Sequence, residues 1–149
     1  MSHVAETGLV VHDLQCLELA CKKLGIQFVH GQTTWEWFGQ WMDDYSQSDA
    51  AYKHGIKPEM YGHSIHAIKV PGTNYEIGVM KNPNGEGFVL VYDFFGEGQV
   101  IVNKLGKGLQ QIKREYSVYR HKKTAKADGR VVTEKRLQNG KIALLARHR

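Results

Sequence analysis

The sequence lacks several features that assign a chain to a functional class. It has no apolar run near the roughly 18 residues that a membrane-spanning helix requires, so we expect no membrane association. Its first residues contain no basic segment followed by an apolar one, which argues against a signal peptide. We therefore expect a cytoplasmic protein.

Cysteine is scarce, and the only two in the sequence are Cys16 and Cys21. They lie five positions apart in a segment with helical spacing, where they point to different faces. A disulfide between them would break the helix. We expect both thiols to be reduced, as is usual in a cytoplasmic protein.

Motifs for metal or phosphate chemistry are missing as well. The sequence has no His-Glu-x-x-His and no paired Cys-x-x-Cys, and Gly106-Lys107-Gly108 is too short for a Walker loop. Histidines at 54, 63 and 66 are a candidate metal site, but His63 and His66 would point to opposite faces of a strand. We expect no metal, no cofactor and no catalytic residue.

Charge is unevenly distributed along an otherwise ordinary chain. Residues 104–149 contain 14 Lys and Arg and 3 acids, whereas residues 1–103 contain 6 Lys and 12 acids. This polarity can orient the protein toward nucleic acid or an acidic protein, or it can be a solvated helix face. Without repeats, linkers or low-complexity tracts, residues 1–149 are expected to form one domain.

Hydrophobic spacing predicts two main helices. Apolar residues recur at helical spacing over residues 14–24, with Asp13 as the N-cap and Gly25 as the C-terminal stop. The second helix runs from about residue 101 or 108 to residue 127, and glycines near its start divide an initial turn from the main helix.

Alternating apolar residues predict the strands of an antiparallel sheet. The predicted strands are 26–30, 33–38, 63–70, 75–81, 87–95, 130–137 and 141–147. Short turns join the third, fourth and fifth into a meander, and an Asn-Gly turn joins the last two into a hairpin. Both sides of strand 87–95 are apolar, so we expect it to be covered on both faces. The predicted fold class is α+β, an antiparallel sheet with two main helices packed on it.

An irregular, Trp-rich insertion at about residues 35–62 interrupts this pattern. Exposed aromatic residues are good anchors for a protein partner. The candidate anchors are Trp35, Trp37, Trp41, Tyr45 and Tyr52. They can instead fill a core where the segment folds over the sheet, or stack on bases, although the acids of the same segment would repel phosphates.

Asp93 and the basic C-terminal third supply the remaining candidates. Asp93 ends an apolar strand, where it is either a catalytic base or, as we prefer, a structural tie to a Lys, Arg or Tyr. Basic residues of the second helix and the hairpin can contact polyanions with salt-dependent affinity. The candidate polyanion-binding residues are Lys113, Arg114, Arg120, Lys122, Lys123, Lys126 and Arg130.

The chain resembles the hypothetical chloroplast reading frame thirty-five family, also called domain of unknown function 1257. The resemblance lies in the first three residues, in residues 14–25, and above all in YEIGVMKNPNGEGFVLVYDFFG. It continues through KLGKGLQQIKREYSVYRHKKTAKADG and the final GRVVTEKRLQNGKIALLARHR, whereas residues 35–62 depart from the family pattern.

The resemblance implies an accessory or adaptor role, because members of this family often accompany an AAA-type ATPase, and it assigns no catalytic residue. The leading hypothesis is a small non-catalytic adaptor acting on a protein partner. The second is a nucleic-acid-binding accessory that uses the basic C-terminal third. An enzyme using Asp93 and the His63/His66 pair is the third.

Overall fold

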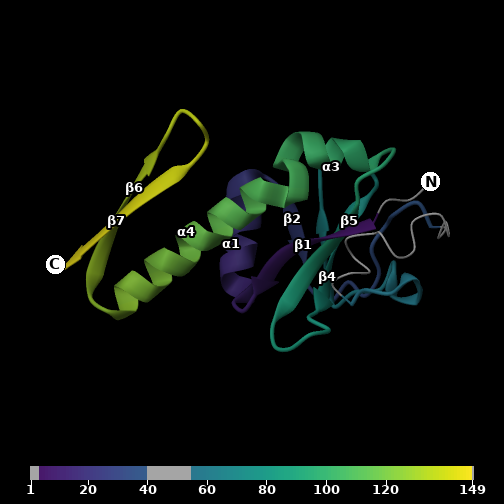
Figure 1. Cartoon of the computed structure of the whole chain (residues 1–149), viewed down its shortest axis with the longest axis horizontal. Coiled ribbons are helices and arrows are strands. Elements are labelled where there is room, and N and C mark those ends of the chain that lie inside the picture. Colours follow the sequence, from purple (N-terminus) through teal and green to yellow (C-terminus); the bar gives the residue numbers. More distant parts are fainter. Residues whose placement is uncertain (1–3, 40–54, 149) are drawn as a thin grey trace.

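A computed structural model of the chain describes residues 4–39 and 55–148 (Figure 1). Five strands form an antiparallel sheet in the order β1-β5-β4-β3-β2. The strands are β1 (Val4–Val11), β2 (Gln27–Val29), β3 (His66–Lys69), β4 (Glu76–Lys81) and β5 (Phe88–Asp93). The predicted α+β fold class, with an antiparallel sheet and helices packed on it, is confirmed.

The predicted meander forms the middle of this sheet. β3 pairs with β4 and β4 pairs with β5 through the two expected turns. In the turn after β4, the Asn82 side chain donates to the main-chain oxygen of Glu86 and accepts from the amide of Asn84. The turn chemistry therefore sets the register in which the two most buried strands pair.

β1 is an edge strand that hydrophobic alternation does not predict. It pairs with β5, but the register shifts between Glu6 and Val10. Gly8 lies at this irregularity with a φ of 79°, and its amide donates to the Glu6 carboxylate. A bulge of this kind interrupts the period of two from which strands are predicted.

Helices cover one face of the sheet. They are α1 (Leu14–Leu24), α3 (Gly98–Leu105) and α4 (Gln110–Ala127), with a 3₁₀ turn at Lys107–Leu109 before α4. Leu17, Ile101 and Ile112 of the helices share one fully buried core with Ile77 and Leu90 of the sheet. The predicted division of the second helix is confirmed.

α1 begins and ends at the predicted residues. Asp13 Oδ1 accepts a hydrogen bond from the Cys16 amide at 3.1 Å, which caps the first turn. Gly25 takes the left-handed conformation that ends the helix, and its amide donates to the carbonyls of Cys21 and Lys22. Both caps confirm the sequence prediction.

Asp13 also joins α1 to α4. Its Oδ2 lies 2.6 Å from Lys123 Nζ and 3.5 Å from Arg120 Nη1. Beside it, the Tyr116 hydroxyl accepts hydrogen bonds from the amides of His12 and Asp13. The hydrogen bond from Lys123, followed by that from the Cys16 amide, lowers the pKa of Asp13 to about 2.

We expect Asp13→Ala to lower the free energy of unfolding by about 0.5–2 kcal/mol near neutral pH, the usual cost of losing an N-cap. A carboxyl with a lowered folded-state pKa stabilises above its unfolded value, so this difference should shrink as pH falls from about 4 toward 2. Urea unfolding of the wild-type protein and of Asp13→Ala across this pH range tests the prediction. Asp13→Asn keeps a capping oxygen and separates the cap from the ion pairs. A difference that stays constant with pH would contradict the prediction.

The two cysteines are free and buried in α1. Burial raises the pKa of Cys21 to about 12, which makes its thiol unreactive at neutral pH. The absence of a Cys16–Cys21 disulfide agrees with the sequence prediction. Among the helices of the described residues, none has the length and apolar character needed to cross a bilayer.

A second core covers the opposite face of the sheet. Trp35 is 2% exposed there, and its indole Nε1 donates to the His63 carbonyl at 3.2 Å. The indole lies directly on β4, because a Cβ placed on Gly78 would come within 2.6 Å of it. Ile56 and Tyr61 complete the packing. The two faces of β5 are therefore both covered, as its sequence predicts.

The segment predicted as strand 33–38 is not a regular strand in the structure. Only an isolated bridge joins Thr34 to His63. The amide of Glu36 instead donates to Glu76 Oε1 at 3.0 Å, and the amide of Phe38 donates to Asp93 Oδ2 at 3.2 Å. Buried carboxylates thus satisfy main-chain groups that a neighbouring strand would otherwise bind.

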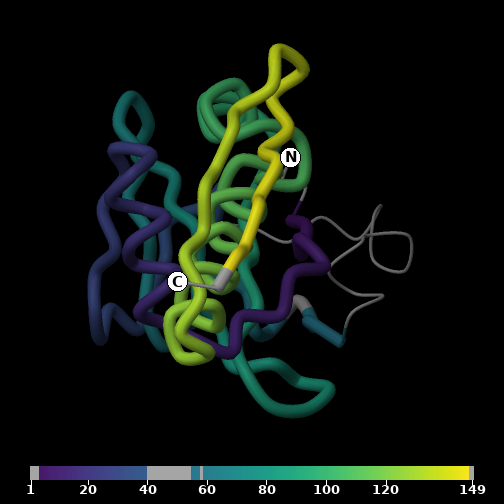
Figure 2. Tube along the Cα trace, turned by 90° about the vertical axis from the view of Figure 1, so that its left-hand side faces the viewer, coloured from purple at the N-terminus to yellow at the C-terminus, as the bar shows by residue number. Residues whose placement is uncertain are grey.

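The C-terminal hairpin forms a sheet of its own. β6 (Arg130–Arg136) pairs with β7 (Ile142–His148), and these strands make a two-stranded sheet separate from the five-stranded one. The views in Figures 1 and 2 both place this hairpin alongside α4. Glu115 of α4 binds Arg136 of β6 through two hydrogen bonds of 2.6 and 3.1 Å, which fix the hairpin to the helix.

Candidate functional site

Of the aromatic residues predicted as partner anchors, the structure describes Trp35 and Trp37. Trp35 is a core residue, so the prediction that it contacts a partner is wrong: its side chain is filling the second core. Trp37 is half-buried, with its ring 5.4 Å from that of Tyr61 in an edge-to-face arrangement. Trp41, Tyr45 and Tyr52 lie outside the described residues.

Asp93 is a structural tie. Its side chain is fully buried at the end of β5, where it accepts hydrogen bonds from the amides of Phe38 and Phe95. Both of these partners are main-chain amides. A carboxylate held by two amides is fixed in place, and this arrangement does not resemble a general base poised for proton transfer.

The candidate histidines do not assemble a metal centre in the part of the chain that the structure describes. The Gly31 amide donates to His66 Nδ1 at 2.8 Å, and burial is the main cause that lowers the pKa of His66. His54 lies outside the described residues. Within residues 4–39 and 55–148, no three His, Cys, Asp or Glu side chains lie together as metal ligands.

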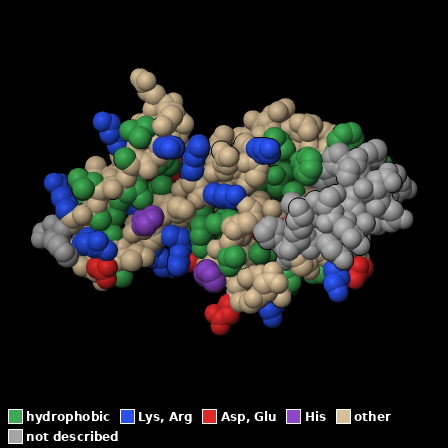
Figure 3. Space-filling model, in the orientation of Figure 1, with side chains coloured by type: hydrophobic (Ala, Val, Ile, Leu, Met, Phe, Trp, Pro, Cys, Tyr) green, Lys and Arg blue, Asp and Glu red, His purple; other side chains and the backbone are tan. Residues whose placement is uncertain are grey.

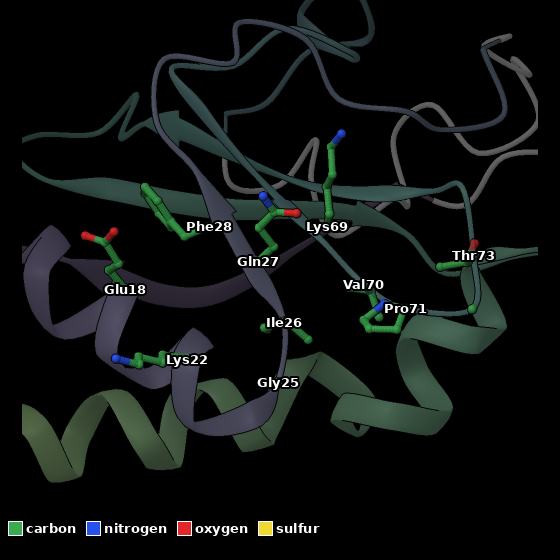
Figure 4. A pocket seen from close by; sticks show the side chains of 11 residues that line it. Glu18, Lys22, Gly25, Ile26, Gln27, Phe28, Lys69, Val70, Pro71 and Thr73 are labelled. Carbon is green, nitrogen blue, oxygen red and sulfur yellow. The ribbon is translucent and has the colours of Figure 1, made fainter.

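A hollow of about 630 Å³ lies between the end of α1, β2 and the turn after β3. Figure 4 shows that the charged groups of Glu18, Lys22 and Lys69 point in different directions there. Glu18 is also bound to His30 at 2.9 Å. The hollow therefore offers no set of converging groups for catalysis or for recognition of a charged ligand.

Ion pairs within the molecule already engage four of the seven predicted polyanion-binding residues. Arg120 and Lys123 bind Asp13, Lys122 binds Glu134, and Arg130 binds Asp128. Among the described residues, no acidic group forms an ion pair with the other three, Lys113, Arg114 and Lys126. The sequence identifies the charges, but it does not show which of them are available.

Two of these available cations, Lys113 and Arg114, line a groove of about 380 Å³ between α4 and β7. The lining residues are Lys113, Arg114, Ser117, Val118 and His121 of α4, and Lys141, Ile142 and Leu144 at β7. Val118 is buried and Ile142 and Leu144 are half-buried, so the groove has an apolar floor. The groove is therefore amphipathic, with cationic groups beside apolar ones.

Helix and strand periodicity place these side chains together. Lys113, Ser117 and His121 are four residues apart on α4 and share one face of the helix. Ile142 and Leu144 are two apart on β7 and share the face that looks toward α4. The groove forms because α4 packs mainly against β6 and less against β7.

The groove is strongly biased toward positive charge. Lys113, Arg114 and Lys141 line it, and it contains no acidic side chain. A Cβ placed on Gly140 would lie 2.9 Å from Arg114 Nη1, so this arginine sits against the hairpin turn. Figure 3 shows basic side chains gathered among hydrophobic ones over α4 and the hairpin, at the left of the view. Leu145, on the outer face of β7, is 64% exposed.

Several residues of the groove were not among the sequence candidates. No sequence motif includes Ser117, His121 or Lys141. The pattern around Ile142 and Leu144 predicts a strand but no site. The i, i+4 spacing from Lys113 through Ser117 to His121 was the available signal. This spacing identifies the groove only once the hairpin is known to pack on α4. That contact joins two separate segments of the sequence, and neither segment predicts it.

Comparison with models of protein families, with curated proteins and with solved structures found no match for the chain. The resemblance to the hypothetical chloroplast reading frame thirty-five family therefore stays a prediction from the sequence.

Proposed function

We propose that the protein is a small non-catalytic binding protein, an adaptor, whose groove between α4 and β7 binds an acidic segment of a protein partner. The observation that carries the proposal is the composition of the groove, in which Lys113, Arg114 and Lys141 surround an apolar floor without an acidic side chain. Such a surface is complementary to a segment that contains both acidic and apolar residues.

A protein partner suits the groove better than a nucleic acid does. Ile142 and Leu144 offer apolar contact area to side chains, but the lining includes no Phe, Tyr or Trp ring on which a base can stack, and His121 is its one imidazole. The adjacent lysines Lys122 and Lys123 would extend a phosphate-binding track. They are bound instead to Glu134 and Asp13. An accessory role beside an AAA-type ATPase is compatible with this proposal and rests on the family resemblance.

Binding of a fluorescein-labelled peptide in which Glu and Val alternate, about as long as β7, tests the proposal at about 0.15 M salt, where screening weakens unspecific attraction. We expect Lys113→Glu plus Arg114→Glu to weaken binding about tenfold or more, as loss of close charge pairs does. Lys69→Glu plus Lys81→Glu makes the same change in net charge at exposed positions of the main sheet and should leave the affinity nearly unchanged. Circular dichroism confirms that each variant is folded.

A single-stranded DNA and a single-stranded RNA of matched charge serve as competitors in the same assay. We expect their binding to disappear at about 0.15 M salt, because it depends on counterion release. Nucleic acid binding that persists at this salt and is lost in the Lys113/Arg114 variant would favour the nucleic-acid alternative. An equal loss of peptide binding in both double variants would mean that net charge, and not the groove, attracts the peptide.

A further inference from the structure

In the part of the chain that the structure describes, β7 is an edge strand beside the groove. Within the described residues, β7 pairs with β6 and with no other strand. A strand at the edge of a sheet carries a row of unpaired N–H and C=O groups, which can pair with a strand from another chain. The groove is lined by β7 and by α4, with no contribution from β6, so it lies on the side of this open edge.

The hairpin turn fixes which residues of β7 face outward. The Leu137 amide donates to the Lys141 carbonyl at 2.8 Å, which makes these two a hydrogen-bonded pair in the register of the hairpin. Hydrogen-bonded and non-bonded pairs alternate in an antiparallel ladder. Ile142, Leu144 and Ala146 therefore belong to non-bonded pairs, and their main-chain N–H and C=O groups point to the open edge.

The same residues connect this edge to the groove. Ile142 and Leu144 direct their main-chain groups outward and place their side chains in the groove lining. A strand added along this edge would keep alternate side chains on the groove face, within reach of Lys113 and Arg114 of α4. Main-chain pairing would supply affinity, and the groove would select the side chains.

The opposite edge, formed by β6, is less open. Glu134 of β6 is bound to Lys122, and Arg136 is bound to Glu115. These ion pairs place side chains of β6 on α4 and hold that strand close to the helix. A second chain therefore has freer access along β7.

Charge determines the occupant. If the β7 strands of two copies paired antiparallel, Lys141 and Arg147 of one copy would lie against Lys141 and Arg147 of the other. Like charges that face each other across strands are destabilising. An acidic segment meets the opposite sign. Alternation of acidic and apolar residues matches a groove that combines cations with an apolar floor.

We infer that the partner binds as an extended segment of alternating acidic and apolar residues, added as a third antiparallel or parallel strand to the free edge of β7. This inference rests on the proposed function, since it specifies how the acidic segment is held in the groove. The hairpin is thereby extended from two strands to three, with the partner's side chains between β7 and α4.

The alternating Glu–Val peptide tests this inference when it is compared with a version that carries N-methyl groups on alternate residues. Methylation removes the donors along one edge and leaves charge and side chains unchanged. Two methylated peptides are made, one with N-methyl groups on the odd-numbered residues and one with them on the even-numbered residues. In one of the two, the methyl groups therefore lie along the edge that faces β7. We expect one methylated peptide to bind the wild-type protein at least about tenfold more weakly than the parent, because several main-chain hydrogen bonds are lost.

A variant of the protein supplies the matching evidence. Ala146→Pro removes one outward N–H and leaves the ladder with β6 intact, whereas Ala146→Val keeps the N–H. We expect the proline variant to bind the parent peptide roughly three- to tenfold more weakly than the valine variant does. Thermal unfolding and circular dichroism check that both variants are folded, and the methylated peptides test the inference on unaltered protein.

The outcomes separate this inference from the proposed function. If both methylated peptides bind as tightly as the parent while Lys113→Glu plus Arg114→Glu abolishes binding, the groove binds the segment without strand addition, and only the inference fails. If the parent peptide does not bind the wild-type protein at about 0.15 M salt, both fail. Light scattering that reveals a dimer dissociated by Ala146→Pro would make a second copy the occupant and overturn the inference.

Discussion

Leu90→Ala should lower the free energy of unfolding by about 2–5 kcal/mol, the usual cost of removing a buried leucine side chain. Leu90 is fully buried in β5, in the core between the sheet and the helices. Neighbouring strands hold the backbone on both sides of β5, so the cavity that the substitution leaves cannot collapse easily. We expect the midpoint of urea unfolding to fall while the slope stays the same.

Leu19→Ala is the matched control for this experiment. Leu19 lies in α1 and is 40% exposed, so the same chemical change there should cost less than about 1 kcal/mol. Alanine also has the higher helix propensity, which offsets part of the loss. Equal effects at the two positions would contradict the assignment of Leu90 to the core.

Local patterns predicted much of this fold from the sequence. Asp13 and Gly25 mark the ends of α1 because each satisfies main-chain groups that the helix leaves unpaired. In β5, both alternate sets of side chains are apolar, and the structure buries one set in each of the two cores. These features depend on residues close in the sequence, which is why they can be predicted.

Features that depend on distant contacts could not be predicted. Gly8 interrupts β1. The residues of β5 that pair with β1 lie more than 70 positions later in the sequence. Alternation over residues 33–38 reflects Trp35 packing on Gly78, but the main-chain hydrogen bonds of this segment go to scattered partners, among them Gly62, Ser64, Glu76 and Asp93. The alternating pattern therefore reflects the packing of Trp35 against the sheet, but the segment is not the regular strand that the pattern predicts.

The candidate site was predicted only in part for the same reason. Charge counting identifies Lys113 and Lys123 as equivalent basic residues of one helix. The structure separates them, because Asp13, 110 residues from Lys123, binds that lysine at 2.6 Å, whereas Lys113 lines the groove. Which charge is available to a partner is decided by tertiary ion pairs. Substitution of Lys122 and Lys123 would therefore test fold stability more than binding.

The ion pair between Glu115 and Arg136 joins the hairpin to α4, and the hairpin forms one wall of the groove. Glu115 is buried in α4, and both of its carboxylate oxygens accept hydrogen bonds from the Arg136 guanidinium. This pair joins α4 to the last residue of β6, immediately before the turn that leads to β7. We therefore expect the position of β7, which forms the second wall of the groove, to depend on this contact.

We expect Arg136→Met to lower the stability of the hairpin by about 1–3 kcal/mol, because it leaves a buried carboxylate without its donor. Hydrogen exchange should become faster at the amides of β6 and β7 while those of β5 keep their protection, since the hairpin forms a separate sheet. Binding of the Glu–Val peptide should weaken as well, although Lys113 and Arg114 are unchanged. Adding Glu115→Met removes the buried charge and should restore much of the protection, because an apolar pair can replace an ion pair. Unchanged exchange in the single variant would show that apolar packing alone holds the hairpin on α4.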